Sequence, residues 1–199
     1  QWTGSELLVV EADESDGTHL ELPLYATMLT NIEVDHLDHH GTFEAIVTSF
    51  DEYLSHVDGP KVVCVDDPRC AALAVAHNAT TYGLAADADY RAVSVHPASG
   101  SFRFEVEHRG ALVGPLELPL RGIHNVVNAA GVVAMATELG VPFAAIASAL
   151  GRFGGVARRF DVRGVIGGAT FVDDYAHLPT EIAAVIAAAR GSGDSWTRV

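Results

Sequence analysis

Residues 7–16 are Leu7-Leu8-Val9-Val10-Glu11-Ala12-Asp13-Glu14-Ser15-Asp16, an apolar run that changes abruptly to carboxylates. Further along, the apolar run Thr27–Ile32 is followed by Glu33-Val34-Asp35-His36-Leu37-Asp38-His39-His40, where histidines join the acids. Short apolar runs of this kind predict buried strands. Parallel strands end at a common edge of the sheet, where open α/β proteins bind ligands. The two stretches therefore predict a divalent-cation site and favour a magnesium-dependent enzyme.

The pattern that follows alternates between helix and strand. Residues 42–56 have apolar side chains at helical spacing, and Lys61–Val65 is strand-like. Asp67-Pro68 opens a further helix that reaches Ala76, because proline suits the first helical turn. Strands alternating with helices predict an α/β fold with a mostly parallel sheet flanked by helices.

The sequence pattern changes between residues 90 and 120, where short runs of alternating apolar and polar residues are broken by glycines. This pattern predicts antiparallel hairpins, which we expect to form a small sheet beside the parallel one. Asn125 is expected to cap a helix over residues 126–139, and Pro142 to begin another that reaches Leu150.

Residues 151–155 are rich in glycine and predict a domain boundary. Beyond them we expect strands at 161–166 and 169–173 and a helix at 179–190, too little to bury a core alone. The predicted organisation is a central domain over residues 1–155 and the beginning of a second, truncated α/β domain over 156–199.

The composition limits the possible partners. The 199-residue chain has a formal net charge of −14, which disfavours non-specific binding to nucleic acid or to anionic membranes. It has no apolar run near the roughly 18 residues of a membrane span. Cys64 and Cys70 are too few and too close for a disulfide framework, so we expect a reducing, cytoplasmic setting.

Glu11 and His36 are the candidate metal ligands. Magnesium takes carboxylate oxygens and keeps several waters, so two protein ligands and substrate phosphates suffice. Asp35 and Asp38 flank His36 and would hold its tautomer. Two alternatives stay open: a solvated acidic loop around Glu11, and a zinc site built from His36 with the neighbouring His39-His40 pair.

Further candidates lie at helix starts and after the glycine-rich segment. His124, Asn125 and Asn128 fall at the start of a helix, where unpaired backbone N–H groups favour anions. Arg158-Arg159 supplies the positive charge that phosphoryl transfer requires. The stretch Val172–Thr180 again places acids, an aromatic residue and a histidine after an apolar run.

Five of these motifs occur in the order and spacing of the Mur ligases, which the chain resembles over nearly its whole length. They are Glu11–Asp16 (EADESD), Asn31–Asp38 (NIEVDHLD), His124–Asn128 (HNVVN), Arg158–Asp161 (RRFD) and Asp173–Thr180 (DDYAHLPT). The resemblance implies an ATP-dependent ligase that joins an amino acid to a carboxylate through an acyl phosphate and a tetrahedral intermediate. It also implies that Glu11 and His36 bind Mg2+.

The resemblance further implies roles for the remaining candidates. Asn128, Arg159 and Asp174 would hold ATP, and the side chains lining the same pocket would be His124, Asn125, Tyr175 and His177. The alanine-adding branch fits best, with UDP-N-acetylmuramate and L-alanine as substrates in peptidoglycan synthesis. Other branches use a modified lysine soon after the His36 motif, and the only lysine here is Lys61.

The sequence departs from the family pattern at two places. The phosphate-binding glycine-lysine loop of the family precedes EADESD and lies outside this sequence, so we expect the chain alone to lack ligase activity. Residue 178 is leucine, where alanine-adding enzymes commonly have a second histidine. The sequence leaves the oligomeric state open.

Three alternative functions also remain at this stage. One is a sister ligase that attaches a recycled tripeptide to UDP-N-acetylmuramate. Another is a metal-dependent hydrolase that uses Glu11, His36 and the His39-His40 pair. The last is a non-catalytic domain whose acidic residues only keep it soluble.

Overall fold

The computed structural model of the protein describes residues 6–191 and residue 196. A six-stranded sheet has the strand order β1-β2-β3-β4-β5-β6, and a separate hairpin of β7 and β8 follows it in the chain. The elements in chain order are η1 (Thr18–Glu21), β1 (Thr27–Leu29), α1 (Leu37–His40), α2 (Phe43–Ser55), β2 (Lys61–Cys64), α3 (Pro68–Ala76), β3 (Thr80–Gly83), β4 (Tyr90–Ala98), β5 (Ser101–His108), β6 (Ala111–Leu118), α4 (Ile123–Glu138), α5 (Phe143–Gly151), β7 (Asp161–Ile166), β8 (Ala169–Asp173) and α6 (Pro179–Gly191).

The predicted α/β class is confirmed. Strands β1 to β4 pair in parallel, and α2 and α3 form the crossovers that parallel neighbours require. Local caps start both helices: the Thr42 hydroxyl accepts from the Ala45 N–H, and the Asp67 carboxylate accepts from the N–H groups of Arg69 and Cys70. These two helices begin and end within a residue or two of the predicted positions.

The sheet is buried on both faces. Val62, Val63 and Cys64 of β2 are at most 4% exposed, as expected of a central parallel strand. Val62 and Cys64 belong to the apolar cluster that contains α4, whereas Val63 belongs to the cluster that contains α2 and α3. Helices therefore cover both faces, with α4 and α5 on one side and α2 and α3 on the other.

The hairpins between residues 90 and 118 do not form a separate sheet, which corrects the prediction. β4 pairs in parallel with β3 through Tyr82 and Tyr90, and β5 and β6 extend the same sheet with antiparallel pairing. The small antiparallel sheet of the molecule is instead the β7–β8 hairpin. Because β6 runs parallel to β4, it returns the chain to the carboxyl edge of the parallel strands, where α4 begins.

The predicted strand over Leu7–Glu11 is not formed. Residues 7–13 are irregular, and the side chains of Leu7, Leu8, Val9 and Val10 are 49%, 63%, 89% and 53% exposed. β1 is the first strand of the sheet and pairs with β2, so this apolar run has no strand beside it within the described residues. An apolar run becomes a strand only where a neighbouring strand satisfies its backbone.

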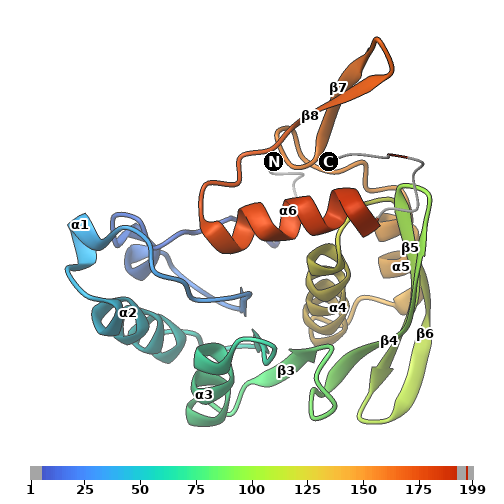
Figure 1. Ribbon diagram of the computed structural model, residues 1–199. Coiled ribbons are helices and arrows are strands. Elements are labelled where there is room, and N and C mark those ends of the chain that lie inside the picture. Colours follow the sequence, from blue (N-terminus) through green and yellow to red (C-terminus); the bar gives the residue numbers. More distant parts are fainter. Residues whose placement is uncertain (1–5, 192–195, 197–199) are drawn as a thin grey trace.

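Of the elements after residue 151, α6 lies beside the carboxyl edge of the sheet. Figure 1 shows α6, in red, running from the side of α1 toward the side of β5, while the β7–β8 hairpin projects away. Thr180 at the start of α6 contacts Glu33 in the loop after β1, and Ala188 near the end of the helix lies beside Gly122. Within the described residues, no helix is long and apolar enough to cross a membrane.

Candidate active site

The acidic loop and the histidine-rich loop lie against each other. His40 Nε2 is 2.7 Å from the Glu14 carbonyl oxygen, and a side chain at Gly17 would lie 3.2 Å from His39 Nε2. Hydrogen bonds from the Ser15 hydroxyl and N–H lower the pKa of Asp13, and the nearby His36 adds to that lowering. The two stretches therefore lie against each other, but through loop contacts and not at the ends of paired strands as predicted.

His36 is held by its neighbour Asp35. The residue has a left-handed backbone, with φ of 49° and ψ of 36°, and it precedes the short helix α1. Its N–H donates to Asp35 Oδ1 at 2.8 Å, and its Nε2 lies 3.3 Å from Asp35 Oδ2. Of the two flanking acids named from sequence, Asp35 is the one that the structure places beside the ring. A hydrogen on Nε2 would leave Nδ1 to bind a cation.

Glu11 lies in the irregular segment before the acidic loop and is exposed. No group of three or more His, Cys, Asp or Glu side chains in the described part of the chain is arranged to hold a metal ion. One carboxylate and one imidazole are a sparse but suitable donor set for magnesium, which retains waters and binds substrate phosphates. The pairing of Glu11 with His36 at a cation stays a prediction.

A second group of candidates lies at the start of α4. The helix begins at Ile123 after Gly122, so the expected cap at Asn125 is wrong; the Asn125 amide instead donates to the Arg121 carbonyl at 2.7 Å. The same amide lies 3.1 Å from His124 Nε2, which can accept when the ring is neutral. Asn128 follows on the same helix and is exposed to solvent.

His124 connects this helix start with the residues after position 156. Its ring is partly accessible to solvent, yet the surrounding atoms desolvate it enough to lower its pKa, an effect that Asp174 opposes and Arg159 reinforces. Asp174 accepts hydrogen bonds from the N–H of Phe160 at 2.7 Å and of Ala176 at 2.8 Å. The structure therefore brings His124, Arg159 and Asp174 into one electrostatic neighbourhood.

The two arginines lie over an aromatic ring. The guanidinium carbons of Arg158 and Arg159 are 4.6 and 5.7 Å from the centre of the Tyr175 ring. Arg159 is also 3.8 Å from Glu181 of α6. Arg158 and Phe160 have left-handed backbones, with φ of 61° and 49°. Such backbone strain persists where surrounding contacts impose it, as at ligand sites.

His177 joins the two groups of candidates. Its Nε2 lies 3.3 Å from Asp35 Oδ2, and its Nδ1 lies 3.1 Å from the Tyr175 carbonyl oxygen. The hydrogen bond to Tyr175, assisted by that to Asp35, raises the pKa of His177. Partial burial alone would raise the pKa of Asp35, but the hydrogen bond from His36 N–H and the pairing with His177 lower it.

Three residues in this region were missed by the sequence argument: Glu33, Thr180 and Glu181. The Thr180 hydroxyl donates to the Glu33 carboxylate. Glu181 accepts from the N–H groups of His177 and Leu178 at 2.9 and 3.2 Å. A glutamate in the third position of a helix that begins with proline is a recognisable capping signal, whereas the partner of Glu33 lies 147 residues away.

The family profile of the Mur ligase middle domain matches residues 3–136. The chain belongs to the Mur ligase family. It is 44% identical over 196 residues to the UDP-N-acetylmuramate–L-alanine ligase of Bradyrhizobium sp. (strain BTAi1 / ATCC BAA-1182), covering 93% of this chain and 42% of that protein. It is 45% identical over 199 residues to the ligase of the same name from Methylorubrum extorquens (strain PA1), covering 94% of this chain and 42% of that protein.

A solved Mur ligase structure has the same fold. The UDP-N-acetylmuramate-alanine ligase MurC from Thermotoga maritima superposes with a TM-score of 0.78 and 28% identity, covering 90% of this chain and 41% of that one. MurF from Acinetobacter baumannii superposes with a TM-score of 0.73 and 26% identity, over 85% of this chain and 38% of that one. The chain therefore spans about two fifths of the length of these Mur ligases.

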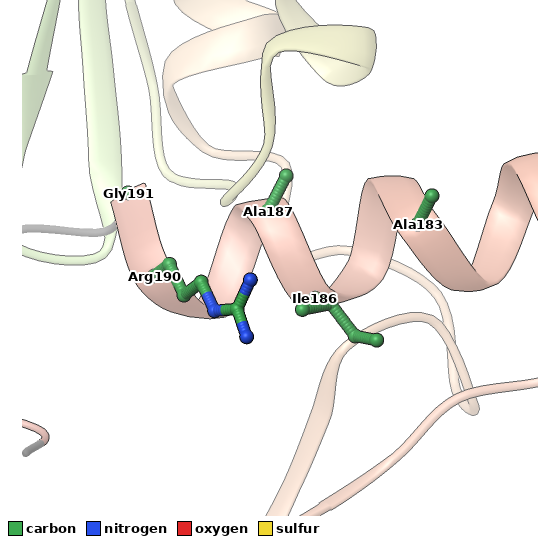
Figure 2. A pocket seen from close by; sticks show the side chains of 5 residues that line it. All are labelled: Ala183, Ile186, Ala187, Arg190 and Gly191. Carbon is green, nitrogen blue, oxygen red and sulfur yellow. The ribbon is translucent and has the colours of Figure 1, made fainter. Parts of the chain in front are cut away.

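Two surface concavities lie away from the residues that the Mur ligase motifs identify. One, of about 560 Å³, is formed along the second half of α6 by Ala183, Ile186, Ala187, Arg190 and Gly191 (Figure 2). It occupies the opposite end of the helix from His177. The other, of about 510 Å³, lies on β4–β6 around His96 and Arg103. Neither concavity contains a predicted site residue.

Proposed function

We propose that this chain is the nucleotide-binding part of an ATP-dependent ligase that joins L-alanine to UDP-N-acetylmuramate in peptidoglycan synthesis. The main support is the 44–45% identity to ligases named for that reaction, over nearly the whole chain. The ordered motifs at Glu11, His36, His124 and Arg159 agree with it.

The proposed reaction has two steps. A carboxylate oxygen of UDP-N-acetylmuramate attacks the γ-phosphorus of ATP, and ADP leaves. The alanine amine then attacks the resulting acyl phosphate, the tetrahedral intermediate expels phosphate, and the nitrogen loses a proton. Phosphoryl transfer requires fixed positive charge near the migrating oxygens. Arg159 is suited to supply that charge because Tyr175 and Glu181 hold its guanidinium in place.

Magnesium would be held by Glu11 and His36, where it would neutralise phosphate charge. Asp35 fits this role for His36 because it holds the imidazole by its other nitrogen. The nucleotide would be held by Asn128, Arg159 and Asp174, and the remaining candidates would line its pocket. Buried, unpaired Cys64 and Cys70 are compatible with a reducing compartment, so we propose that the protein acts in the cytoplasm.

The hydrolase alternative gains no support from the histidine pair. His40 contacts the Glu14 carbonyl oxygen and His39 lies beside Gly17, and neither belongs to a metal-binding cluster in the described part of the chain. These contacts fit a structural role for both rings in holding the acidic loop.

The test uses the protein expressed from its complete coding sequence. ADP release and product mass are measured with ATP, UDP-N-acetylmuramate and either L-alanine or the tripeptide. We expect turnover with alanine, and we expect His36→Ala to lower kcat/KM for Mg-ATP by at least about tenfold. The control, His96→Ala at an exposed position on β4, should retain activity within about twofold. Turnover with the tripeptide alone would assign the sister ligase, and ATP-independent hydrolysis would refute the proposal.

A further inference from the structure

At the carboxyl edge of the sheet, one carboxylate oxygen of Asp35 contacts two imidazole rings. Asp35 Oδ2 is 3.3 Å from Nε2 of His36 and 3.3 Å from Nε2 of His177, which lies 142 residues later in the chain. The other oxygen, Oδ1, accepts from the His36 N–H at 2.8 Å. Asp35 is about one quarter exposed, so these polar contacts compete with water less than fully exposed ones would.

His177 is fixed on both sides of its ring. While Nε2 faces Asp35, Nδ1 lies 3.1 Å from the Tyr175 carbonyl oxygen and 3.4 Å from Glu181 Oε2. The same glutamate oxygen accepts from the N–H groups of His177 and Leu178. The start of α6 is thus a stiff unit, because the glutamate in its first turn caps it.

A second contact joins the same two segments. The Thr180 hydroxyl donates to Glu33 Oε2, and the Asn31 side-chain amide donates to Glu33 Oε1 at 3.5 Å. Glu33 and Asp35 stand two residues apart in the loop after β1, facing Thr180 and His177 at the start of α6. Two contacts between these segments restrict the rotation of α6 relative to the loop after β1 as well as the distance between them.

We propose that Asp35 is a positioning residue, which couples the docking of α6 on the loop after β1 to the orientation of the His36 ring. Glu33 and Thr180 form the second contact of that docking. The functional meaning rests on the proposed ligase, in which His36 would bind the cation. Loss of His177 leaves Asp35 Oδ2 beside one imidazole, so the surroundings of the His36 ring change although the substitution lies 142 residues from Asp35 in the sequence.

The docking is tested by cross-linking in the protein expressed from its complete coding sequence. Cysteines replace Glu33 and Thr180, which removes the hydrogen bond between them and leaves the Asp35–His177 contact to hold the two segments. The cysteines are joined with a short bismaleimide, and background labelling is low because Cys64 and Cys70 are buried. We expect Asp35→Asn to lower the cross-linking rate about two- to fivefold, the range for a partly exposed charged pair. Asp38→Asn, which removes an exposed charge from α1 directly after that loop, is the matched control and should leave the rate unchanged.

The orientation of the ring is tested without reference to activity. With 15N-labelled histidine, long-range 1H–15N correlation reports the tautomer and hydrogen bonding of His36. His177→Gln should shift the His36 ring nitrogen signals, while His96→Gln, at an exposed position on β4, should leave them in place. The coupling predicts both results; an unchanged cross-linking rate in Asp35→Asn, or unchanged His36 signals in His177→Gln, would overturn it.

Measuring ligation by the wild type and by Asp35→Asn distinguishes failure of this inference from failure of the proposed function. If the wild-type protein ligates alanine, Asp35→Asn should raise the Mg2+ concentration for half-maximal rate by more than it lowers kcat. An unchanged Mg2+ requirement would overturn the coupling even if docking is weakened. If the wild-type protein does not ligate alanine, the proposed function fails, and cross-linking and ring signals still decide whether Asp35 positions His36.

Discussion

Replacing His19 with phenylalanine is expected to stabilise the protein. His19 lies in η1, is 2% exposed, and sits with its ring centre 5.6 Å from that of Phe50 and 5.4 Å from that of Tyr53. Neither of its ring nitrogens has a hydrogen-bond partner among the described residues. A buried polar group left without a partner costs about 1–3 kcal/mol, and phenylalanine keeps the ring while removing that cost.

The expected gain in unfolding free energy at pH 7.5 is about 1 kcal/mol. It combines the relief of roughly 2 kcal/mol from removing unpaired nitrogens with about 1 kcal/mol for fitting a slightly larger ring. The aromatic contacts to Phe50 and Tyr53 are retained in the variant and should contribute little to the difference.

The difference should grow on acidification. Burial lowers the pKa of His19, an effect that His40 reinforces and that Glu14, Asp13 and Asp16 oppose. As the pH falls below the ordinary value of 6.5, the unfolded chain binds a proton that the folded chain does not. The wild type then loses stability until the pH reaches the lowered pKa, by at most about 1.4 kcal/mol per pH unit. The phenylalanine variant lacks this loss.

Urea unfolding of the complete protein at pH 7.5 and pH 5.5 measures both effects. Comparable m-values in the variant and the wild type would show that midpoint shifts report stability. His96→Phe, at an exposed position on β4, is the control and should change stability by less than about 0.5 kcal/mol. If His19→Phe destabilises at pH 7.5, or if its advantage does not increase at pH 5.5, the assignment of His19 as an unpaired neutral ring is wrong.

Three further outcomes test the fold. Gly131→Ala should destabilise by about 1–3 kcal/mol in urea, because its methyl group would lie 2.7 Å from the Tyr82 ring; a neutral change would contradict the close approach of α4 to the sheet. Asp67→Ala should cost about 1 kcal/mol in the same assay through loss of the α3 cap, and an unchanged midpoint would refute that cap. Burial raises the pKa of Cys64 and of Cys70, so maleimide labelling of both should be at least about tenfold slower in the folded protein than in urea; equal rates would contradict their burial.

The elements that sequence predicted best carry their own local signals. α2 and α3 have capping side chains, and α2 buries Ile46, Phe50 and Leu54 at helical spacing. β3 was missed because Thr80–Gly83 is short and has no alternation to distinguish it from a loop. The run Leu7–Glu11 has an apolar composition but lacks a neighbouring strand, and strand pairing is a property that one segment cannot encode.

Part of the candidate site could also be predicted from sequence and part could not. The order of the motifs identified His36, His124, Arg159 and Asp174 as candidate site residues, and the last three lie in one electrostatic neighbourhood. The contact between His177 and Asp35 was beyond sequence reasoning, because it joins positions 142 residues apart. The Asn125 cap failed for a local reason: the helix already begins at Ile123, so the Asn125 amide donates to the Arg121 carbonyl.

Because pairing changes from parallel to antiparallel after β4, the turn between β4 and β5 and the turn between β5 and β6 lie at opposite ends of the strands. The turn at Gly100 faces Arg121, on the rim where the loop after β1 and the start of α4 also lie. The turn at Gly110 lies at the far rim, and a side chain there would meet nothing within 4 Å. A dye or an immobilisation handle attached at residue 110 would therefore leave the edge with the candidate site unobstructed, which makes this turn a suitable attachment point for single-molecule work.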